Sequence, residues 1–488
     1  MRPPVLISVE RGQALALALV LLAGAAAALV QMFDAGRLVH RKARLANAID
    51  AAAYSGAVVQ ARALNFLAYA NRAVVAHQVA MAHLVTLASW ARFGDTQARQ
   101  LAASNPPATL IGGLFGARHG AAYAGSGTAR GAGADAAWPD GGLARAFAGH
   151  DAVVHDVLAR AQAAVQAGLA GSRDAAVRAI LAANHDGDPA VLDLRWLDDD
   201  LPGFIARQSG GARARLKSVV ETAADRYGFL APRDHTASSP LPIDRRCPLL
   251  RHQLRRRGST GMAGLDAWRS LDTQSYHALR SNRWIGCYYR EYPMGRGAVL
   301  PGNGGVDADT PYVDDPPDDF ADQDFWRWVQ QATRWDLLDE AANPLANSLA
   351  VAQRDVWRGR GLPAFPELSA DALRMGGTAR LRFAVVARRD GGASGASPVT
   401  GYRVSGASAV SPRASPAPFT AVAAGSLRFG EAPALAAVAA AETYYQRPGP
   451  RADGRRELPS LFQPYWHARL GAATDDERRR ALALLEAP

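Results

Sequence analysis

The sequence contains almost no lysine, because only Lys42 and Lys217 occur among its 55 lysines and arginines. Its formal net charge of +10 is therefore carried by arginines, which are scattered and lie among acidic clusters such as Asp198 to Asp200. There is no dense basic stripe interleaved with aromatic residues and no recognisable nucleic-acid-binding module. The sequence therefore indicates no nucleic-acid partner and is typical of a mildly basic exported protein.

Motifs of catalysis are also missing. The sequence has no GxSxG elbow, P-loop, paired dinucleotide fingerprint, CxxC or HExxH. His77 and His83 are six residues apart, so they do not share a helical face as two metal ligands at i and i+4 would. We therefore assign no catalytic, cofactor-binding or metal-ligating residue, and we expect no cofactor and no enzymatic activity.

Two acidic stretches, 185–193 and 307–324, are rich in the oxygen ligands that Ca²⁺ prefers. Neither follows a full calcium-loop register with its central glycine and terminal glutamate. The pattern favours solvated acidic loops, with calcium binding as the alternative.

Proline is absent between Pro4 and Pro106, and a long apolar run lies within this interval. The 22 residues from Gly12 to Phe33, GQALALALVLLAGAAAALVQMF, would measure about 33 Å as a helix. This length matches the hydrocarbon core of a bilayer, roughly 30 Å thick. A cleaved signal peptide and a buried core helix are the alternatives, and Ala23-Gly24-Ala25 offers small residues for cleavage. The helix formers that continue beyond Asp34 favour a membrane anchor.

The apolar pattern continues as an amphipathic helix. Apolar residues recur at intervals of three to seven through 34–105, and Gly94-Asp95 and the SNPP sequence at 104–107 are expected to break or end the helix. The apolar face can pack on the protein's own body or, in part, on neighbouring subunits.

The N-terminal pattern resembles a known family. Arg11-Gly12-Gln13, the FDAGRL of 33–38 and the ANAIDAAAYSGA of 46–57 resemble the Tad-like N-terminal domain of TadG-type Flp pilus-assembly proteins. The sequence LFQPYWHARL at 461–470 is similar to a later segment of large members. The resemblance implies a single-pass protein of the bacterial inner membrane, with a short cytoplasmic N-terminus and a periplasmic bulk. It also implies pilin-like partner subunits and a role in assembling a tight-adherence pilus.

The sequence departs from this family pattern in two ways. Glu10 precedes the apolar run, whereas prepilins carry a glutamate inside it, so we do not expect prepilin-type processing. No metal-binding DxSxS motif is present, and DGGASGAS from Asp390 has the wrong spacing. The orientation expected from charge is a separate question. Two arginines precede the apolar run and four basic residues follow it closely, so a literal positive-inside count would place the bulk in the cytoplasm.

The rest of the chain predicts an α+β body. Helical patterns cover 150–184 and 210–227, strands are expected at 275–299, 379–392 and about 400–412, and helices at 431–444 and 474–487. We expect the following divisions: 1–11 cytoplasmic N-terminus, 12–33 transmembrane helix, 34–105 long amphipathic helical stalk, 106–149 Gly/Ala-rich flexible segment, 150–235 helical region, and 236–488 α+β periplasmic domain.

Only two cysteines occur, Cys247 and Cys287. In an oxidising compartment an even pair in one domain favours a disulfide, here closing a loop of about 40 residues and contributing about 3–4 kcal/mol if unstrained. Two unrelated buried thiols are the alternative.

Two functional hypotheses follow. The first is a structural and assembly role, in which Gly24, Ala25 and Ala28 allow close helix packing against pilin-like subunits in the membrane. The alternative is an exported or membrane-anchored hydrolase with a site assembled from distant residues.

Overall fold

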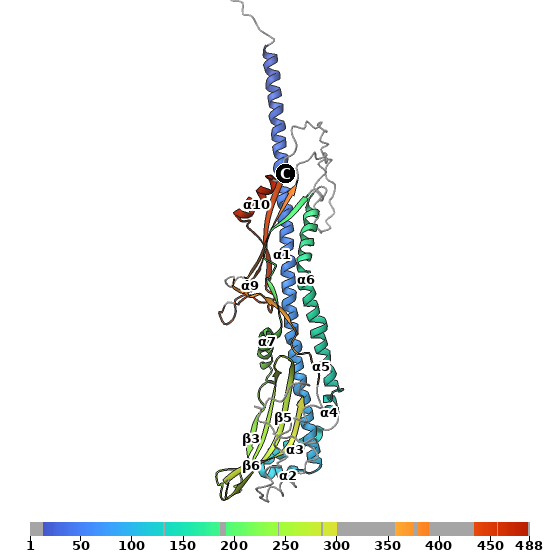
Figure 1. The fold of residues 1–488 in the computed structure, drawn as a ribbon, viewed down its shortest axis with the longest axis vertical. Helices are drawn as coiled ribbons and strands as arrows, with labels where there is room; N and C mark the ends of the chain where they lie inside the picture. The colour runs from blue at the N-terminus through green and yellow to red at the C-terminus, as the bar shows by residue number, and fades with distance from the viewer. Residues whose placement is uncertain are drawn as a thin grey trace, which may run out of the picture.

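The protein is an elongated α+β molecule built along one helix, as the computed structural model shows (Figure 1). The structure describes residues 13–129, 132–185, 192–242, 244–284, 286–299, 357–374, 379–389, 434–455 and 457–486. The predicted elements at 307–324 and about 400–412, and residues 186–191 of the other acidic stretch, lie outside these residues.

Helix α1, Gln13–Ala102, runs without interruption for 90 residues, or about 135 Å. Its first thirty residues project beyond the body, and continuous burial of one face begins at Leu45 (Figure 1). The expected break at Gly94-Asp95 is wrong, because α1 continues through it. The helix instead ends just before the SNPP sequence, as predicted.

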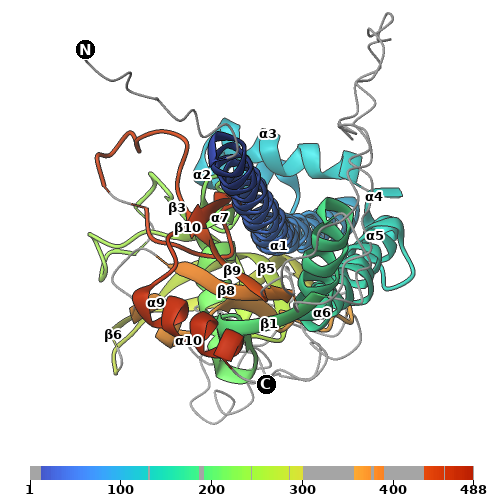
Figure 2. The ribbon, with the colours of Figure 1, turned by 90° about the horizontal axis from the view of Figure 1, so that it is seen from above.

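A four-stranded antiparallel sheet packs on the first buried part of α1. Its order is β1 (Leu192–Asp199), β8 (Arg380–Arg389), β9 (Leu435–Tyr445) and β10 (Trp466–Gly471). Helix α6, Ala159–Asn184, lies beside α1 (Figure 2). The shared core includes Ile49, Val177 and Phe383.

Strand β9 corrects the predicted helix at 431–444. Its LAAVAAAETYY sequence is alanine-rich, which favours a helix locally. In the fold it is hydrogen-bonded on both sides, by β8 and by β10. Ala439 and Ala441 belong to the buried core against α1. Their small side chains allow the sheet to approach the helix closely.

A second antiparallel sheet packs on the far part of α1. It contains β3 (His235–Ser238), β4 (Gln253–Ala263), β5 (Ala267–Asn282) and β6 (Gly286–Val299) in sequence order. Strands β5 and β6 confirm the strands expected at 275–299, and the turn between them follows Asn282.

Between the sheets lie smaller elements. Strands β2 (Ile205–Gln208) and β7 (Phe365–Leu368) pair with each other, and η4 (Gly210–Arg213) leads into α7 (Ala214–Asp225). The expected helix at 210–227 is thus confirmed, but the division 150–235 is not wholly helical because it contains β1 and β2. Helix α9, Ala370–Arg374, follows β7, and α10, Asp475–Glu486, confirms the predicted final helix.

The division 106–149 is folded where an irregular flexible segment was expected. Its described residues form α2 (Ala108–Phe115), α3 (Ala117–Gly125), η1 (Ser126–Ala129), α4 (Ala132–Ala137) and the start of α5 (Gly142–Ala152). A π-helical turn, η2 (Val153–Leu158), joins α5 to α6.

Two glycines of this division allow helices to pack closely. A Cβ at Gly120 would lie 2.7 Å from the Cα of Gly112, so these residues allow α2 and α3 to touch. Ile111 and Phe115 are buried, and the Phe115 ring packs edge-on against Tyr276. At Gly112 and Gly120 the absence of a side chain therefore allows close helix contact.

Strand β6 lies directly on α1 at two glycines, Gly295 and Gly297. A Cβ at Gly297 would overlap the Ser89 carbonyl oxygen and lie 2.5 Å from the Phe93 nitrogen. The Ser89 hydroxyl donates to the Gly297 carbonyl at 3.0 Å, and Arg92 donates to the Ala298 carbonyl at 2.6 Å. At Gly297 the contact is between backbone and backbone, with no flexible side chain to yield.

We expect Gly297→Ala to lower the free energy of unfolding by about 2 kcal/mol, because the methyl group forces the strand off the helix. Gly261→Ala in β4 is the matched control, since a Cβ there meets nothing within 4 Å. Urea unfolding followed by circular dichroism measures both variants. Equal stabilities would contradict the close contact.

Candidate functional site at the exposed end of helix α1

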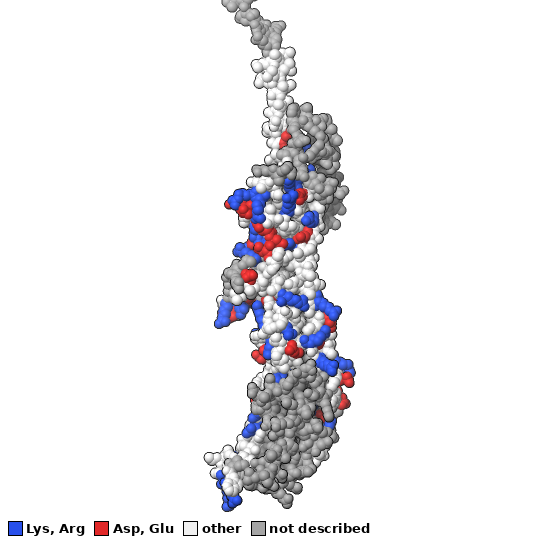
Figure 3. Space-filling model, in the orientation of Figure 1, with Lys and Arg blue, Asp and Glu red and all other residues white. Residues whose placement is uncertain are grey.

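The first part of α1 is an apolar helix that no other element covers, and we call residues 13–33 the rod. Its large apolar side chains are mostly 60% to 72% exposed, an unusual state for a contiguous apolar surface. They are Leu15, Leu17, Leu19, Val20, Leu21, Leu22, Leu29, Met32 and Phe33. Within the described residues, α1 is the one helix long and apolar enough to cross a membrane, and none of its most apolar stretch is buried. The rod is the white projection at the top of Figure 3.

The three residues predicted to pack in the membrane lie on this rod. Gly24, Ala25 and Ala28 are all exposed, and a Cβ at Gly24 would meet nothing within 4 Å. Gly24 and Ala28 are separated by one helical turn and share a face. They form a shallow strip at which another helix can approach the backbone closely.

Basic residues surround the rod where it enters the body. Arg37 lies over the Phe33 ring at 5.6 Å, and Arg41, Lys42 and Arg44 follow along α1. Partial burial, together with the neighbouring cations Arg37 and Arg389, lowers the pKa of Arg41. The end of β8 therefore brings a further cation to this junction.

Below the junction, Arg173 fastens α6 to the first sheet. Its side chain is 2% exposed and makes a bidentate ion pair with Asp199, at 2.6 and 2.8 Å. The guanidinium lies 4.1 Å from the Trp196 ring centroid and 5.3 Å from that of Phe383. A buried charge needs such pairing to offset its desolvation. A Cβ at Gly56 would lie 2.7 Å from Val177, so α1 and α6 also touch here.

Helix α10 is attached to the outer face of β8 through Glu477. Both terminal nitrogens of Arg382 donate to its carboxylate, which is fully buried. Thr474 and Glu477 form a capping box: the Thr474 nitrogen donates to Glu477 at 2.7 Å, and the Glu477 nitrogen donates to the Thr474 hydroxyl at 3.2 Å. The spacing Thr-x-x-Glu was readable in the sequence.

Further along α1, Asn71 holds the middle of the body. Its side-chain nitrogen donates to the carbonyls of Pro366 and Leu461 at 2.9 and 2.7 Å, and its oxygen accepts from Gln162 at 2.7 Å. The neighbouring Glu367 accepts backbone hydrogen bonds from Leu368 and Leu461, while burial raises the pKa of Glu367.

Asp272 links the second sheet to α1 by buried hydrogen bonds. Its carboxylate is fully buried and accepts two hydrogen bonds from Arg233, at 2.8 and 3.0 Å. The Ser89 hydroxyl of α1 donates to it at 2.7 Å. Buried hydrogen bonds thus link each part of the body to α1 or to elements that pack on it. The rod therefore continues from a helix that is held in place by these contacts.

The two cysteines are joined in the structure. The Cys247 and Cys287 sulfurs lie 2.06 Å apart, linking the loop before β4 to the start of β6. This bond lies in the second sheet, at the end of the molecule opposite the rod (Figure 1).

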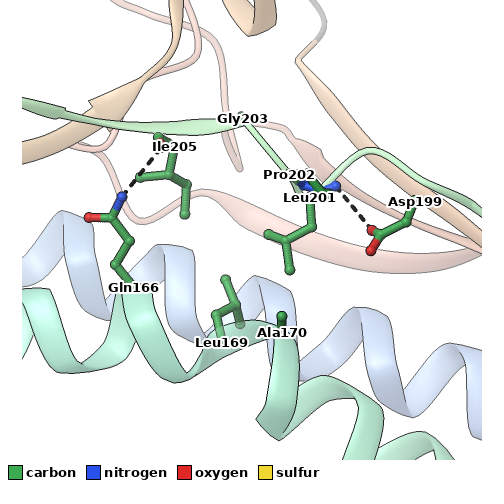
Figure 4. A pocket seen from close by; sticks show the side chains of 8 residues that line it. All are labelled: Gln166, Leu169, Ala170, Asp199, Leu201, Pro202, Gly203 and Ile205. Carbon is green, nitrogen blue, oxygen red and sulfur yellow. Dashed lines mark hydrogen bonds between the residues drawn. The ribbon is translucent and has the colours of Figure 1, made fainter.

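A pocket of about 250 Å³ lies between α6 and the segment from β1 to β2 (Figure 4). Its lining is largely apolar, with Leu169, Leu201 and Ile205 facing one another. Its one carboxylate, Asp199, is occupied by Arg173 and by the backbone nitrogen of Leu201. The lining therefore provides no free nucleophile or base.

The predicted histidines have packing contacts. The Nδ1 atoms of His77 and His150 lie 2.7 Å apart, and burial together with His150 lowers the pKa of His77. His83 stacks on Phe229 with ring centroids 5.2 Å apart. Among the described residues, no group of three or more His, Cys, Asp or Glu side chains is arranged to hold a metal ion.

We expect stability to fall in acid through Glu477. The Arg382 and Thr474 hydrogen bonds lower its pKa to about 2, below the ordinary value of 4.5. The unfolded chain therefore binds the proton more tightly, so the contribution of Glu477 is complete above pH 4.5 and is lost as the pH falls toward 2. Glu477→Gln should lower the melting temperature at pH 7 by on the order of 5 °C and weaken its dependence on acid.

Thermal melts at pH 7 and pH 3 test this expectation. The control is Glu221→Gln on α7, which removes a carboxylate that is 38% exposed. An equal acid dependence in the protein and in Glu477→Gln would contradict the role given to Arg382.

Comparisons of the chain with protein-family models, with curated proteins and with solved structures find no match. A functional assignment therefore depends on the chain's own features. These are the exposed rod, the buried contacts beneath it and the disulfide at the opposite end.

Proposed function

We propose that this protein is a membrane-anchored, pilin-like structural and assembly component of a tight-adherence pilus of the Flp type. One observation carries the proposal: α1 is exposed and apolar over the rod and becomes the central core helix from Leu45 onward. A single helix thus occupies two environments, and lipid is the environment that suits its first part.

The proposed action is helix packing, not chemistry. In lipid the hydrophobic effect does not drive helices together, so association depends on close contact between small residues. Gly24, Ala25 and Ala28 provide such a surface, and the rod carries it rigidly because α1 does not break on entering the body. The partner is the apolar helix of another pilin-like subunit.

We infer that the rod spans the bacterial inner membrane once and that the bulk of the chain is periplasmic. The disulfide supports this orientation, because such bonds persist in oxidising compartments and are rare in the cytosol. The family resemblance of the N-terminal pattern supports the same orientation. The basic residues that follow the rod would favour a cytoplasmic bulk by the positive-inside rule, but that rule weakens when a large domain is translocated.

A charge in the rod should prevent stable membrane integration. We expect Leu21→Arg to cost about 3 kcal/mol at the centre of the span and to release much of the protein in alkaline carbonate extraction. Val39→Arg is the control, because Val39 is exposed to a similar degree but lies beyond the apolar run. Full retention of Leu21→Arg in the membrane pellet would argue against a spanning rod.

Filling the small-residue strip should weaken partner association. We expect Gly24→Leu with Ala28→Leu to reduce co-purification of pilin-like subunits by about tenfold while leaving the protein in the membrane. Ala23→Leu with Ala27→Leu is the matched control, since it makes a similar change about 100° around the helix. Intact co-purification with the first pair would remove the lateral-packing hypothesis, whereas loss with both pairs would assign association to the whole rod.

A further inference from the structure

The end of the molecule opposite the rod forms a compact tip. It consists of the loop at 239–252 and the end of the β5–β6 hairpin, at the lower end of Figure 1. From Leu45 to Ala102, α1 extends about 87 Å between the rod and this region.

Three contacts hold the two parts of the tip together. The disulfide joins Cys247 to Cys287, the Tyr289 hydroxyl donates to the Arg251 carbonyl at 3.0 Å, and Ser281 donates to Asp244. The loop and the hairpin therefore present one surface.

The tip is strongly basic. Residues 239–252 and 280–290 contain six arginines and one carboxylate, Asp244. That carboxylate is engaged by Ser281 and by the backbone nitrogen of Arg246. Arg245, Arg246 and Arg283 are exposed, and basic side chains occupy the lower extremity of the space-filling view (Figure 3).

Large apolar side chains are exposed on the same surface. Leu249 is 91% exposed, Trp284 67% and Leu241 51%. Leu249 lies two residues after Cys247, and Trp284 lies three residues before Cys287, so the disulfide fixes the bases of both segments. Arg283 lies over the Trp284 ring at 4.8 Å, which places a cation beside the most exposed aromatic residue of the tip.

We propose that the tip binds the surface of a second bilayer, one that contains anionic phospholipids and faces the membrane of the rod. Arginines are attracted to anionic headgroups, while tryptophan and leucine enter the boundary between headgroups and acyl chains. A soluble polyanion would engage the arginines but would leave Leu249 and Trp284 in water. The proposal depends on the rod being an anchor and is independent of the pilus assignment.

The test uses the full-length protein in nanodiscs of phosphatidylcholine, so that the rod is already occupied by lipid. Sedimentation with large vesicles measures binding to phosphatidylcholine alone and to mixtures containing phosphatidylglycerol. We expect binding to the mixed vesicles only, weakened by salt. Leu249→Ser with Trp284→Ser should reduce the binding constant at least about tenfold.

A second variant, Arg245→Gln with Arg246→Gln and Arg283→Gln, should reduce binding about a hundredfold, or about fivefold for each cation, and abolish the salt dependence. The control is Arg478→Gln with Arg479→Gln and Leu482→Ser on α10, a similar change at exposed residues far from the tip. It should bind like the unaltered protein, and melting curves verify that every variant is folded.

Two results would overturn the proposal. One is the absence of sedimentation with the mixed vesicles. The other is unchanged binding by the Leu249 and Trp284 variant together with full competition by soluble polyphosphate, which would identify the tip as a polyanion site.

Discussion

The structure depends on one constraint, which is that a single unbroken helix must satisfy two environments. Up to about Arg44 the surface of α1 faces outward on all sides, and from Leu45 onward one face is covered. Among the described residues, three hydrophobic clusters contain buried α1 residues, in order along the helix: Leu45 to Ala57, Ala61 to Leu67, and Val74 to Ala88. Leu101 of α1 packs against a fourth cluster. The sheets and helices are therefore layers arranged along α1, and a break in it would separate the rod from its base.

Each layer is fixed by a buried polar contact as well as by apolar packing. Arg173 with Asp199 and Asp272 with Arg233 are close ion pairs whose buried member is at most 2% exposed. Such pairs contribute little net stability compared with apolar packing, because desolvation offsets the attraction. Their effect is directional: the Arg173 fork fits one placement of β1 on α6, and Asp272 accepts from Ser89 in one register of β5 on α1. We infer that they set the alignment of layers that apolar side chains alone would allow to slide.

The sequence predicted what depends on local pattern. The long helix, the strands at 275–299, α7 and α10 each follow from periodicity or turn and cap residues within a few positions. Strand β9 was missed because alanine favours a helix locally, whereas its conformation is decided by β8 and β10. Residues 106–149 were predicted to be flexible because glycine is common in flexible segments. Glycine also allows two helices to approach closely, as Gly120 does here. The disulfide of the tip was predicted, but Arg173, Leu249 and Trp284 were not singled out, since their neighbours are brought together only by the fold.

The two ends of the molecule differ in a way that fits a bridging role. The rod is apolar on all sides and contains no charge from Gln13 to Phe33, as the interior of a bilayer requires. The tip combines apolar side chains with arginines, which suits the boundary of a bilayer and not its interior. In the proposed arrangement the body separates the two ends along the roughly 87 Å of α1 from Leu45 to Ala102. Such a body would have to resist bending, since flexibility would let the tip fold back onto the membrane of the rod. The continuous core along α1 and the aligning ion pairs are the features that would resist it.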